Sequence, residues 1–308
     1  MLAEYKQFIK EFPQTQEQKS LAPLTTLKVG GPADLYYEVT NIDELPDLIQ
    51  AAQKLNIRLF ILGGGSNLVF SEKGFRGLII HMKANSIQAE GDTIIADAGA
   101  LTSQVLQMAL KNNLSGMEKL MGLPGTIGGA VRGNAGAFGV EIKDIFEKAL
   151  IYNEEKGIHE ESAQYFQFRY RSSKIKERKG QDIILRVHLN LRKKDTTEVM
   201  KETLEILKNR AGKQPQGKNT GSFFKNPSTD NSAGKLLDEA GCKGLRIGDI
   251  QVSDQHANWI MNLGNATQTD IIALMKEMQK RVKEKFNVEL EPEVQFVDEE
   301  GYLSAKRR

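Results

Sequence analysis

Apolar residues recur along this chain with two spacings, which predict a mixture of helices and strands. From Leu45 to Leu55 they follow helical spacing, and residues 58–62 have the apolar character of a buried strand. Further strands are predicted at 33–39, 77–81 and 93–97, and a helix is predicted with Thr102 as its N-cap. The first third of the chain therefore predicts a fold that contains both sheets and helices.

The later part of the chain continues this mixture. In residues 183–191, Leu185, Val187 and Leu189 alternate with polar residues, which predicts a half-buried antiparallel strand. The composition turns polar at Arg192–Asp195, where we expect a domain boundary. Helices are predicted around 199–210, 231–240 and 267–286, and a final strand that contains 288–297. The methionines of the third helix recur at helical spacing, which is typical of a core.

Two glycine-rich segments interrupt the pattern. Gly63–Leu68 follows a predicted strand, and Gly122–Gly139 contains seven glycines in eighteen residues. Glycine lets backbone N–H groups approach a ligand, and successive N–H groups can form an anion-binding concavity. A flexible linker is the alternative, but Ile127, Val131 and Phe138 are apolar residues that a solvated linker does not need. Neither segment matches the dinucleotide fingerprint or the P-loop, so a bound phosphate would be held differently from those folds.

Composition limits the classes of function. The 308 residues, 40% of them hydrophobic, suffice for two domains or three small ones. Lys and Arg number 42 against 40 Asp and Glu, a balance that does not favour nucleic acid as a partner. Cys242 is the only cysteine, which excludes an intramolecular disulfide and fits a reducing compartment.

Membrane and metal partners are not predicted either. No apolar run approaches the ~18 residues of a membrane span, and the charged N-terminus cannot form a signal-peptide core. The four histidines show no metal-binding spacing. We expect a soluble cytoplasmic protein without a bound metal and without an obligate protein partner.

Three polar segments are candidates for chemistry. In Phe168–Ser173 cationic and aromatic side chains alternate, so an arginine there could bind a carboxylate through two hydrogen bonds or lie on an exposed strand edge. Asn219–Pro227 places a Gly-Ser turn beside two phenylalanines, and Ser222 alone is typical of a turn residue. Glu293 stands in the last predicted strand, where pattern alone favours a solvent-facing position.

Taken together, these segments resemble one enzyme family. They occur in the order and spacing of the UDP-N-acetylenolpyruvoylglucosamine reductases, also called UDP-N-acetylmuramate dehydrogenases, over roughly residues 20–300. The segments are 63–68, 123–130, 134–139, 170–173, 221–227 and 293–294. The motif Gly221-Ser-Phe-Phe-Lys-Asn-Pro227 is the most specific of them.

The resemblance implies a fold and a function. It implies reduction of UDP-N-acetylglucosamine enolpyruvate to UDP-N-acetylmuramate by NADPH through non-covalently bound FAD, a step of peptidoglycan precursor synthesis. The fold class would be α+β, with a two-subdomain FAD-binding fold of the vanillyl-alcohol-oxidase type and a C-terminal α+β substrate-binding domain. We expect an N-terminal arm with the first FAD-binding subdomain over 1–75, the second over 76–194, and the substrate-binding domain over 195–308.

The resemblance also implies site residues. Arg171 and a protonated Glu293 would stabilise charge at the substrate carboxylate, and Ser222 would donate a proton. FAD would be held by Gly63, Gly64, Gly65, Ser66, Asn67, Leu68, Pro124, Gly125, Thr126, Gly128, Gly129 and Asn134. Tyr170, Lys225 and Asn226 would contact the substrate.

One departure and two alternatives remain. The chain resembles the short form of the family, which lacks a tyrosine-bearing insertion, so the residues that bind the UDP end stay unassigned. An FAD-dependent alcohol or sugar oxidase of the same fold is an alternative. Many such oxidases attach flavin covalently, often at a Gly-His pair, and this sequence has no Gly-His pair. A non-catalytic nucleotide-binding protein is a second alternative, but it would not explain the motif around Ser222.

Overall fold

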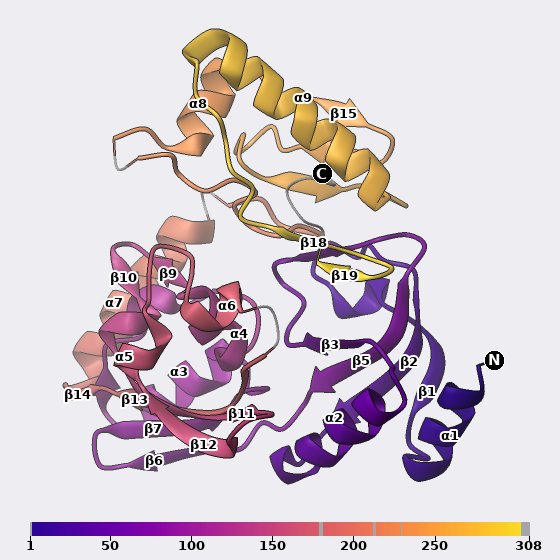
Figure 1. Ribbon diagram of the computed structural model, residues 1–308. Coiled ribbons are helices and arrows are strands. Elements are labelled where there is room, and N and C mark those ends of the chain that lie inside the picture. The colour runs from indigo at the N-terminus through magenta and orange to yellow at the C-terminus, as the bar shows by residue number, and fades with distance from the viewer. Residues whose placement is uncertain (1, 179–180, 212–213, 229, 303–308) are drawn as a thin grey trace. The chain divides into compact units, whose positions relative to one another are not determined.

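The computed structural model describes residues 2–178, 181–211, 214–228 and 230–302 (Figure 1). Its contacts divide the chain into two compact units. Unit 1 comprises Met1–Thr15, Tyr36–Gly64 and Leu78–Arg210. Unit 2 comprises Gln16–Leu35, Gly65–Gly77 and Ala211–Arg308. The division at 75/76 and 194/195 that the sequence suggested stays a prediction.

The first part of unit 1 contains helices α1 (Ala3–Glu11) and α2 (Leu45–Lys54) and strand β3 (Leu59–Leu62). Strands β2 (Pro32–Val39) and β5 (Phe75–Met82) begin with residues of unit 2 and end with residues of unit 1. Strand β3 pairs in parallel with β5. A 3-10 turn, η2 (Ile42–Glu44), precedes α2 and is capped by Asn41. Burial of Leu45, Leu48 and Ile49 on one side of α2 confirms the predicted helix.

An antiparallel five-stranded sheet forms the second part of unit 1, in the order β12-β11-β13-β7-β6 (Figure 1). Its strands are β6 (Ile87–Glu90), β7 (Thr93–Asp97), β11 (Phe146–Asn153), β12 (Gly157–Ser162) and β13 (Ile183–Asn190). Leu185, Val187 and Leu189 of β13 are buried between polar neighbours, which confirms the predicted alternation. Helices α3 (Thr102–Lys111) and α4 (Ile127–Gly133) pack on this sheet.

The predicted cap of α3 is wrong by one residue. The N-cap is Leu101, and Thr102 is the first helical residue. The Thr102 hydroxyl instead donates to the carbonyl of Gly125, 3.3 Å away, so it connects α3 to the second glycine-rich segment. A preference for threonine at N-caps was outweighed here by a tertiary hydrogen bond.

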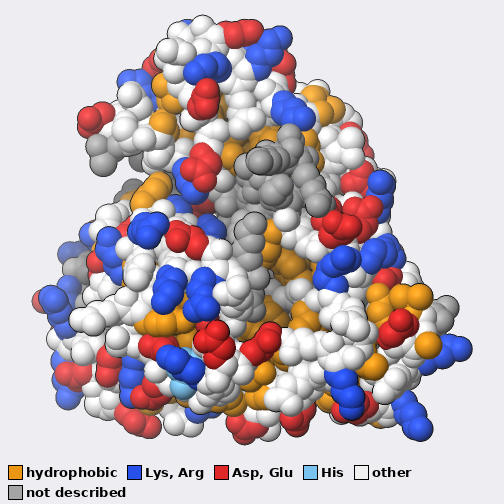
Figure 2. Space-filling view, viewed as in Figure 1, with side chains coloured by type: hydrophobic (Ala, Val, Ile, Leu, Met, Phe, Trp, Pro, Cys, Tyr) orange, Lys and Arg blue, Asp and Glu red, His pale blue; other side chains and the backbone are white. Residues whose placement is uncertain are grey.

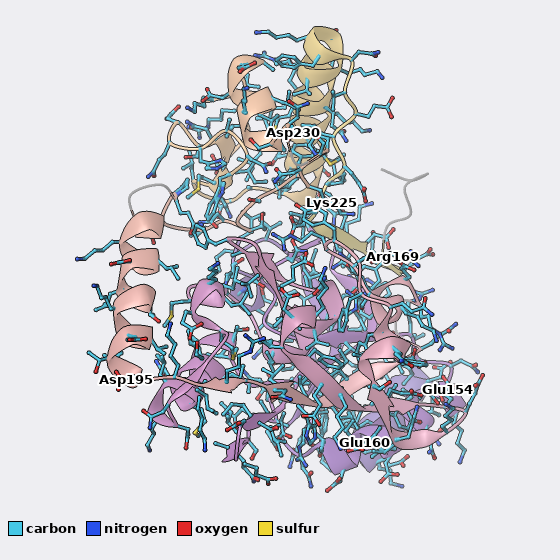
Figure 3. The ribbon with its side chains drawn as sticks, turned by 90° about the vertical axis from the view of Figure 1, so that its left-hand side faces the viewer. Glu154, Glu160, Arg169, Asp195, Lys225 and Asp230 are labelled. Carbon is cyan, nitrogen blue, oxygen red and sulfur yellow. The ribbon has the colours of Figure 1, made fainter. Side chains whose placement is uncertain are left out.

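Short elements complete unit 1. They are β8 (Leu114–Ser115), η3 (Glu118–Leu120), β9 (Gly136–Ala137), β10 (Val140–Glu141), η4 (Ile142–Asp144), α5 (Ala163–Phe166), α6 (Lys174–Glu177) and β14 (Arg192–Lys193). Helix α7 (Thr196–Ala211) follows Asp195, which is labelled in Figure 3.

Unit 2 is built on two three-stranded sheets. The first has the order β15-β16-β17 and packs against the long helix α9, with α8 beside it; the second has the order β19-β18-β4. The elements are β1 (Gln16–Ser20), η1 (Ala22–Leu24), β4 (Leu68–Phe70), α8 (Ala233–Glu239), β15 (Arg246–Ile247), β16 (Ile250–Val252), β17 (Ile260–Asn262), α9 (Gln268–Phe286), β18 (Gln295–Asp298) and β19 (Gly301–Tyr302).

The predicted extent of the last strand is wrong. Strand β18 begins only at Gln295, where it pairs in parallel with Leu68 of β4. The residues before it lie outside this sheet, and Pro292, which has no N–H to donate, forms only an isolated β-bridge with Phe224. Their backbone groups bond elsewhere, since the Glu293 N–H donates to the Phe223 carbonyl at 2.8 Å.

The core of unit 2 joins distant parts of the sequence. Leu27, Val29 and Val69 pack in one cluster with residues of the last ninety positions, including Phe223 and Phe296. Helix α9 contributes Ile271, Met275, Met278 and Val282, so the predicted methionine core is confirmed. A cut at residue 195 would therefore separate Leu27, Val29 and Val69 from the rest of this core.

On the face shown in Figure 2, acidic and basic side chains are interspersed. None of the helices in the described part of the chain is long and apolar enough to cross a membrane. Histidine, cysteine and carboxylate side chains of the described residues form no group of three suited to a metal ion.

Candidate functional site

The two glycine-rich segments lie against each other in unit 1. A Cβ on Gly64 would be 2.6 Å from the Cα of Gly125, and one on Gly63 would be 2.8 Å from the Oγ1 of Thr126. Any side chain at these positions would push the segments apart, so glycine is required for the backbones to meet. Leu101, which is 45% exposed, forms a β-bridge with Thr126. Bare backbone beside an exposed apolar side chain fits the diphosphate and the ring of a flavin nucleotide.

The rest of the first segment belongs to unit 2. Gly65 has a φ of +62°, and its Cβ would collide with the Leu24 carbonyl. The Gly65 carbonyl accepts a hydrogen bond from the Thr26 N–H at 3.2 Å. Asn67 donates through Nδ2 to the carbonyl of Glu293, 3.1 Å away. The predicted FAD-binding residue Asn67 is thereby joined to the predicted catalytic residue Glu293.

Helix α4, which the sequence did not predict, organises the second segment. Three of its seven residues are glycine, and glycine disfavours a helix by about 1 kcal/mol per residue. The Thr126 side chain compensates as the N-cap by accepting from the Gly129 N–H at 3.4 Å. Gly128 packs against Ala98 and donates its N–H to that residue's carbonyl at 3.0 Å. Gly129, by contrast, is exposed.

We expect Gly129→Val to yield folded protein with little bound flavin. Among the described residues, a Cβ at 129 would meet Thr126 Oγ1 at 3.5 Å, which is ordinary contact. The branched side chain would then occupy space proposed for the cofactor. Absorbance of the purified variant measures its flavin content. Gly133→Val is the matched control, because a Cβ at the opposite end of α4 meets no described atom within 4 Å. Equal flavin content in both variants would place the cofactor elsewhere.

The segment that carries Arg171 is fixed to the C-terminal end of α4. Asn134 is fully buried in a left-handed conformation and donates to the Arg169 carbonyl at 3.0 Å. Ser173, also fully buried, donates to the Arg132 carbonyl at 2.6 Å. Arg171 lies between these two anchors. The role of Asn134 toward FAD stays a prediction, and within the protein its side chain positions the arginine segment.

Arg171 lies in a tight turn, not on a strand edge. Its φ is +55°, and Lys176 Nζ donates to its carbonyl at 2.7 Å. The guanidinium carbon lies 5.2 Å from the ring centre of Tyr170, and Nη1 would be 3.2 Å from a Cβ on Gly136. Arg169, labelled in Figure 3, points instead to Glu177, 3.2 Å away. The two arginines of the motif therefore have different surroundings, and Tyr170 is 48% exposed beside Arg171.

Ser222 and Glu293 are brought together in unit 2. Phe223 donates its N–H to the carbonyl of Asn258 and accepts from the N–H of Glu293, each at 2.8 Å. Its ring and that of Phe224 are buried in the core. Ser222, immediately before them, is exposed, and Glu293 is partly buried. The buried rings of Phe223 and Phe224 thus fix the turn that carries the accessible hydroxyl of Ser222. The backbone of Glu293 is attached to the same turn by one hydrogen bond.

A cavity of about 510 Å³ opens beside Ser222. It is lined by Ser222, Asn226, His256 and Asn258, together with charged residues of and near α8. Sequence reasoning missed His256 and Asn258, because nothing in their spacing signals chemistry.

The two predicted substrate residues of this unit already have protein partners. Lys225, labelled in Figure 3, forms an ion pair with Glu291 at 2.6 Å. Asn226 Oδ1 accepts from the N–H of Ala233, where α8 begins, at 3.0 Å. Asn226 nevertheless lines the cavity, so the orientation of its side chain is set before any ligand binds.

His256 is held as a neutral acceptor. Its Nδ1 accepts from the N–H of Asn258 at 3.1 Å, and burial lowers the pKa of the ring from 6.5. A backbone hydrogen bond and Asp238 raise this pKa and Lys243 lowers it, but burial has the largest effect and the net direction is down. In the folded protein the imidazole therefore stays unprotonated at pH values where the unfolded chain takes up a proton.

The pH dependence of stability follows from this shift. Because the unfolded chain binds the proton more tightly, the free energy of unfolding should fall as the pH drops below about 6.5. His256→Asn keeps an acceptor near Nδ1 but cannot titrate, so its loss of stability below that pH should be smaller. Urea unfolding between pH 8 and about 5 measures both proteins. Identical pH profiles would show that His256 does not titrate with unfolding.

Two models of known protein families match this chain, each over a different part. A family model for an FAD binding domain matches residues 33–158. A second, described as UDP-N-acetylenolpyruvoylglucosamine reductase, C-terminal domain, matches residues 213–297.

Relatives along the whole length agree with these matches. The UDP-N-acetylenolpyruvoylglucosamine reductase of Caldanaerobacter subterraneus subsp. tengcongensis is 42% identical over 277 residues, 89% of this chain and 91% of the relative. That of Carboxydothermus hydrogenoformans is 40% identical over 92% of this chain and 94% of its own length. The crystal structure of the reductase from Thermus caldophilus superposes with a TM-score of 0.77 at 33% identity, covering 92% of this chain and 97% of that one. The predicted α+β class, an FAD-binding fold followed by a C-terminal domain, is confirmed.

Proposed function

The chain belongs to the family of UDP-N-acetylenolpyruvoylglucosamine reductases, and we propose that it reduces UDP-N-acetylglucosamine enolpyruvate to UDP-N-acetylmuramate with FAD as its cofactor and NADPH as its reductant. One structural observation supports this most strongly. Phe223 connects the Ser222 turn through its backbone to both Asn258 and Glu293, so a hydroxyl and a carboxyl residue are presented from one rigid framework.

The proposed cofactor site uses the predicted glycine segments. The residues proposed to bind FAD are those predicted from the sequence: Gly63, Gly64, Gly65, Ser66, Asn67, Leu68, Pro124, Gly125, Thr126, Gly128, Gly129 and Asn134. FAD, bound non-covalently by these residues, would supply the transfer of hydride from NADPH to the terminal carbon of the enolpyruvyl group. The contribution of the chain is to present backbone without side chains where the two segments meet.

The substrate is proposed to be oriented by its carboxylate. As negative charge builds toward that group, the planar guanidinium of Arg171 can stabilise it through two parallel hydrogen bonds. Glu293, in its protonated form, can donate a further hydrogen bond. Tyr170, Lys225 and Asn226 are proposed to contact the remainder of the substrate.

Ser222 is proposed to complete the reaction by giving its hydroxyl proton to the carbon next to the carboxylate. Hydride at one carbon and a proton at the other together saturate the double bond, so atoms and charge balance. A serine hydroxyl is a weak acid, so it can act only against a strongly basic carbon held within hydrogen-bond reach. Because Ser222 lines an open cavity, water can return a proton to its oxygen.

The proposed setting is the cytoplasm, where the lone buried Cys242 stays reduced, with a small-molecule UDP-sugar as the partner. No protein partner is needed for the reaction as proposed.

A turnover experiment tests the function against the alcohol or sugar oxidase alternative. The purified yellow protein should consume more than one equivalent of NADPH per flavin only when the enolpyruvyl nucleotide is present, and the product should be UDP-N-acetylmuramate. Denaturation should release all the yellow colour into the filtrate. Colour retained by the chain, together with oxygen consumption driven by an alcohol or a sugar, would support the oxidase.

A further inference from the structure

Asn258 is a buried polar residue whose side chain pairs with the turn that carries Ser222. Its side chain is 3% exposed and lies between the cavity and the Phe223–Phe224 pair. Its Oδ1 accepts from the Phe224 N–H at 2.9 Å, and its Nδ2 donates to the Phe224 carbonyl at 2.9 Å. The amide group therefore pairs with both backbone polar groups of one residue, as a neighbouring strand would.

The backbone of Asn258 continues this pairing toward Ser222. Its carbonyl accepts from the Phe223 N–H at 2.8 Å, and a β-bridge joins Ser222 to the next residue, Trp259. Three consecutive residues of the catalytic turn are thus aligned on this short segment. On the opposite side, the Phe223 carbonyl holds the N–H of Glu293. A displacement of the turn would therefore move Ser222 and Glu293 together.

Asn258 is itself held in place. His256 Nδ1 accepts from the Asn258 N–H at 3.1 Å, and a Cβ on Gly234 would approach the imidazole Cε1 to 2.9 Å. The ring is therefore packed closely against α8. Asn258 cannot shift without breaking hydrogen bonds to both His256 and the turn.

We propose that Asn258 is a positioning residue for the proton transfer, acting by fixing the turn that carries Ser222. The inference rests on the proposed role of Ser222. It requires no contact of Asn258 with the substrate. Small displacements of a reacting group slow catalysis steeply, roughly 10²-fold for about 1 Å. Loss of Asn258 should accordingly slow the step that uses Ser222 and spare the step that does not.

The test compares Asn258→Ala with Asn262→Ala. Asn262 is a matched control, since it is 5% exposed and its side chain also bonds backbone, donating to Leu27 and accepting from Gly264. It does not bond the Ser222 turn. In anaerobic stopped flow, Asn258→Ala should slow reoxidation by the enolpyruvyl nucleotide by roughly 10–100-fold while reduction by NADPH stays near the wild-type rate. Asn262→Ala should leave the ratio of the two rates close to wild type. If both variants change this ratio equally, Asn258 is only structural.

Two further measurements keep the proposal falsifiable. Asn258→Asp retains the size and one acceptor but loses the donor to Phe224, so it should resemble Asn258→Ala. Wild-type rates in this variant would overturn the proposal.

Amide hydrogen exchange of the wild-type protein should show Phe223 and Phe224 protected as strongly as the amides that join β16 and β17. Rapid exchange at both amides would overturn it even if neither variant folds. Amide exchange does not depend on activity. If the proposed function fails, the nucleotide will not reoxidise the flavin of the wild-type protein. That result is distinguishable from rapid exchange at Phe223 and Phe224, which would overturn the role of Asn258.

Discussion

Ser222→Ala should separate the two halves of the reaction more sharply than any other substitution. Reduction of the flavin by NADPH should proceed at about the wild-type rate, because the hydroxyl has no role before hydride reaches the substrate. Reoxidation by the enolpyruvyl nucleotide should become ~10²–10⁴-fold slower, which is the loss of rate typical when a general acid is removed. Ser222 is exposed while its neighbours Phe223 and Phe224 are buried, so fold and flavin content should survive.

Two companion variants sharpen this experiment. Ser222→Cys, more acidic but larger, should restore part of the second rate. Ser228→Ala removes another hydroxyl of the same region, one that accepts from the N–H of Asn231 at 3.1 Å and does not line the cavity, and should leave both rates unchanged. Equal slowing of both half-reactions by Ser222→Ala would mean that the residue positions the cofactor or a shared site and is not the proton donor.

Arg171→Lys should be nearly as damaging, although it preserves the charge. An ammonium group cannot reproduce the planar fork that binds a carboxylate through two parallel hydrogen bonds. Losing one such stabilising contact to developing charge costs roughly 10²–10³ in rate. The anchors at Asn134 and Ser173 hold the backbone on either side of residue 171 and are unaffected by the change. Steady-state turnover with NADPH and the enolpyruvyl nucleotide measures the loss.

Arg169→Lys provides the matched control for this prediction. Arg169 lies two residues away on the same turn, but its side chain pairs with Glu177 at the surface, where an ion pair contributes little. It should keep near-normal turnover. Near-normal turnover of Arg171→Lys as well would count against a two-bond clamp on the carboxylate.

Sequence periodicity predicted the regular elements well, because burial decides them locally. The alternation in β13 and the methionine stripe of α9 are each explained by one buried face. The two glycine segments that the sequence singled out lie against each other, and the collisions that side chains would cause at Gly63 and Gly64 give the steric reason for glycine there. Their role toward FAD stays a prediction.

What the sequence could not show depends on contacts between distant residues. Helix α4 was missed because its glycines argue against a helix, while the Thr126 cap and the bond from Gly128 to Ala98 support one. The core of unit 2 includes Leu27 and Val69, far from the rest in sequence. Asn258 gave no signal at all, since its importance lies in two hydrogen bonds to a residue 34 positions away.

An anaerobic titration of the purified protein tests the central claim most directly. One equivalent of NADPH per flavin should bleach the yellow colour. One equivalent of the enolpyruvyl nucleotide should then restore the oxidised spectrum and yield one UDP-N-acetylmuramate. A flavin that NADPH reduces but that stays bleached with the nucleotide, and regains its colour only when oxygen is admitted, would contradict the assignment as a reductase of this substrate.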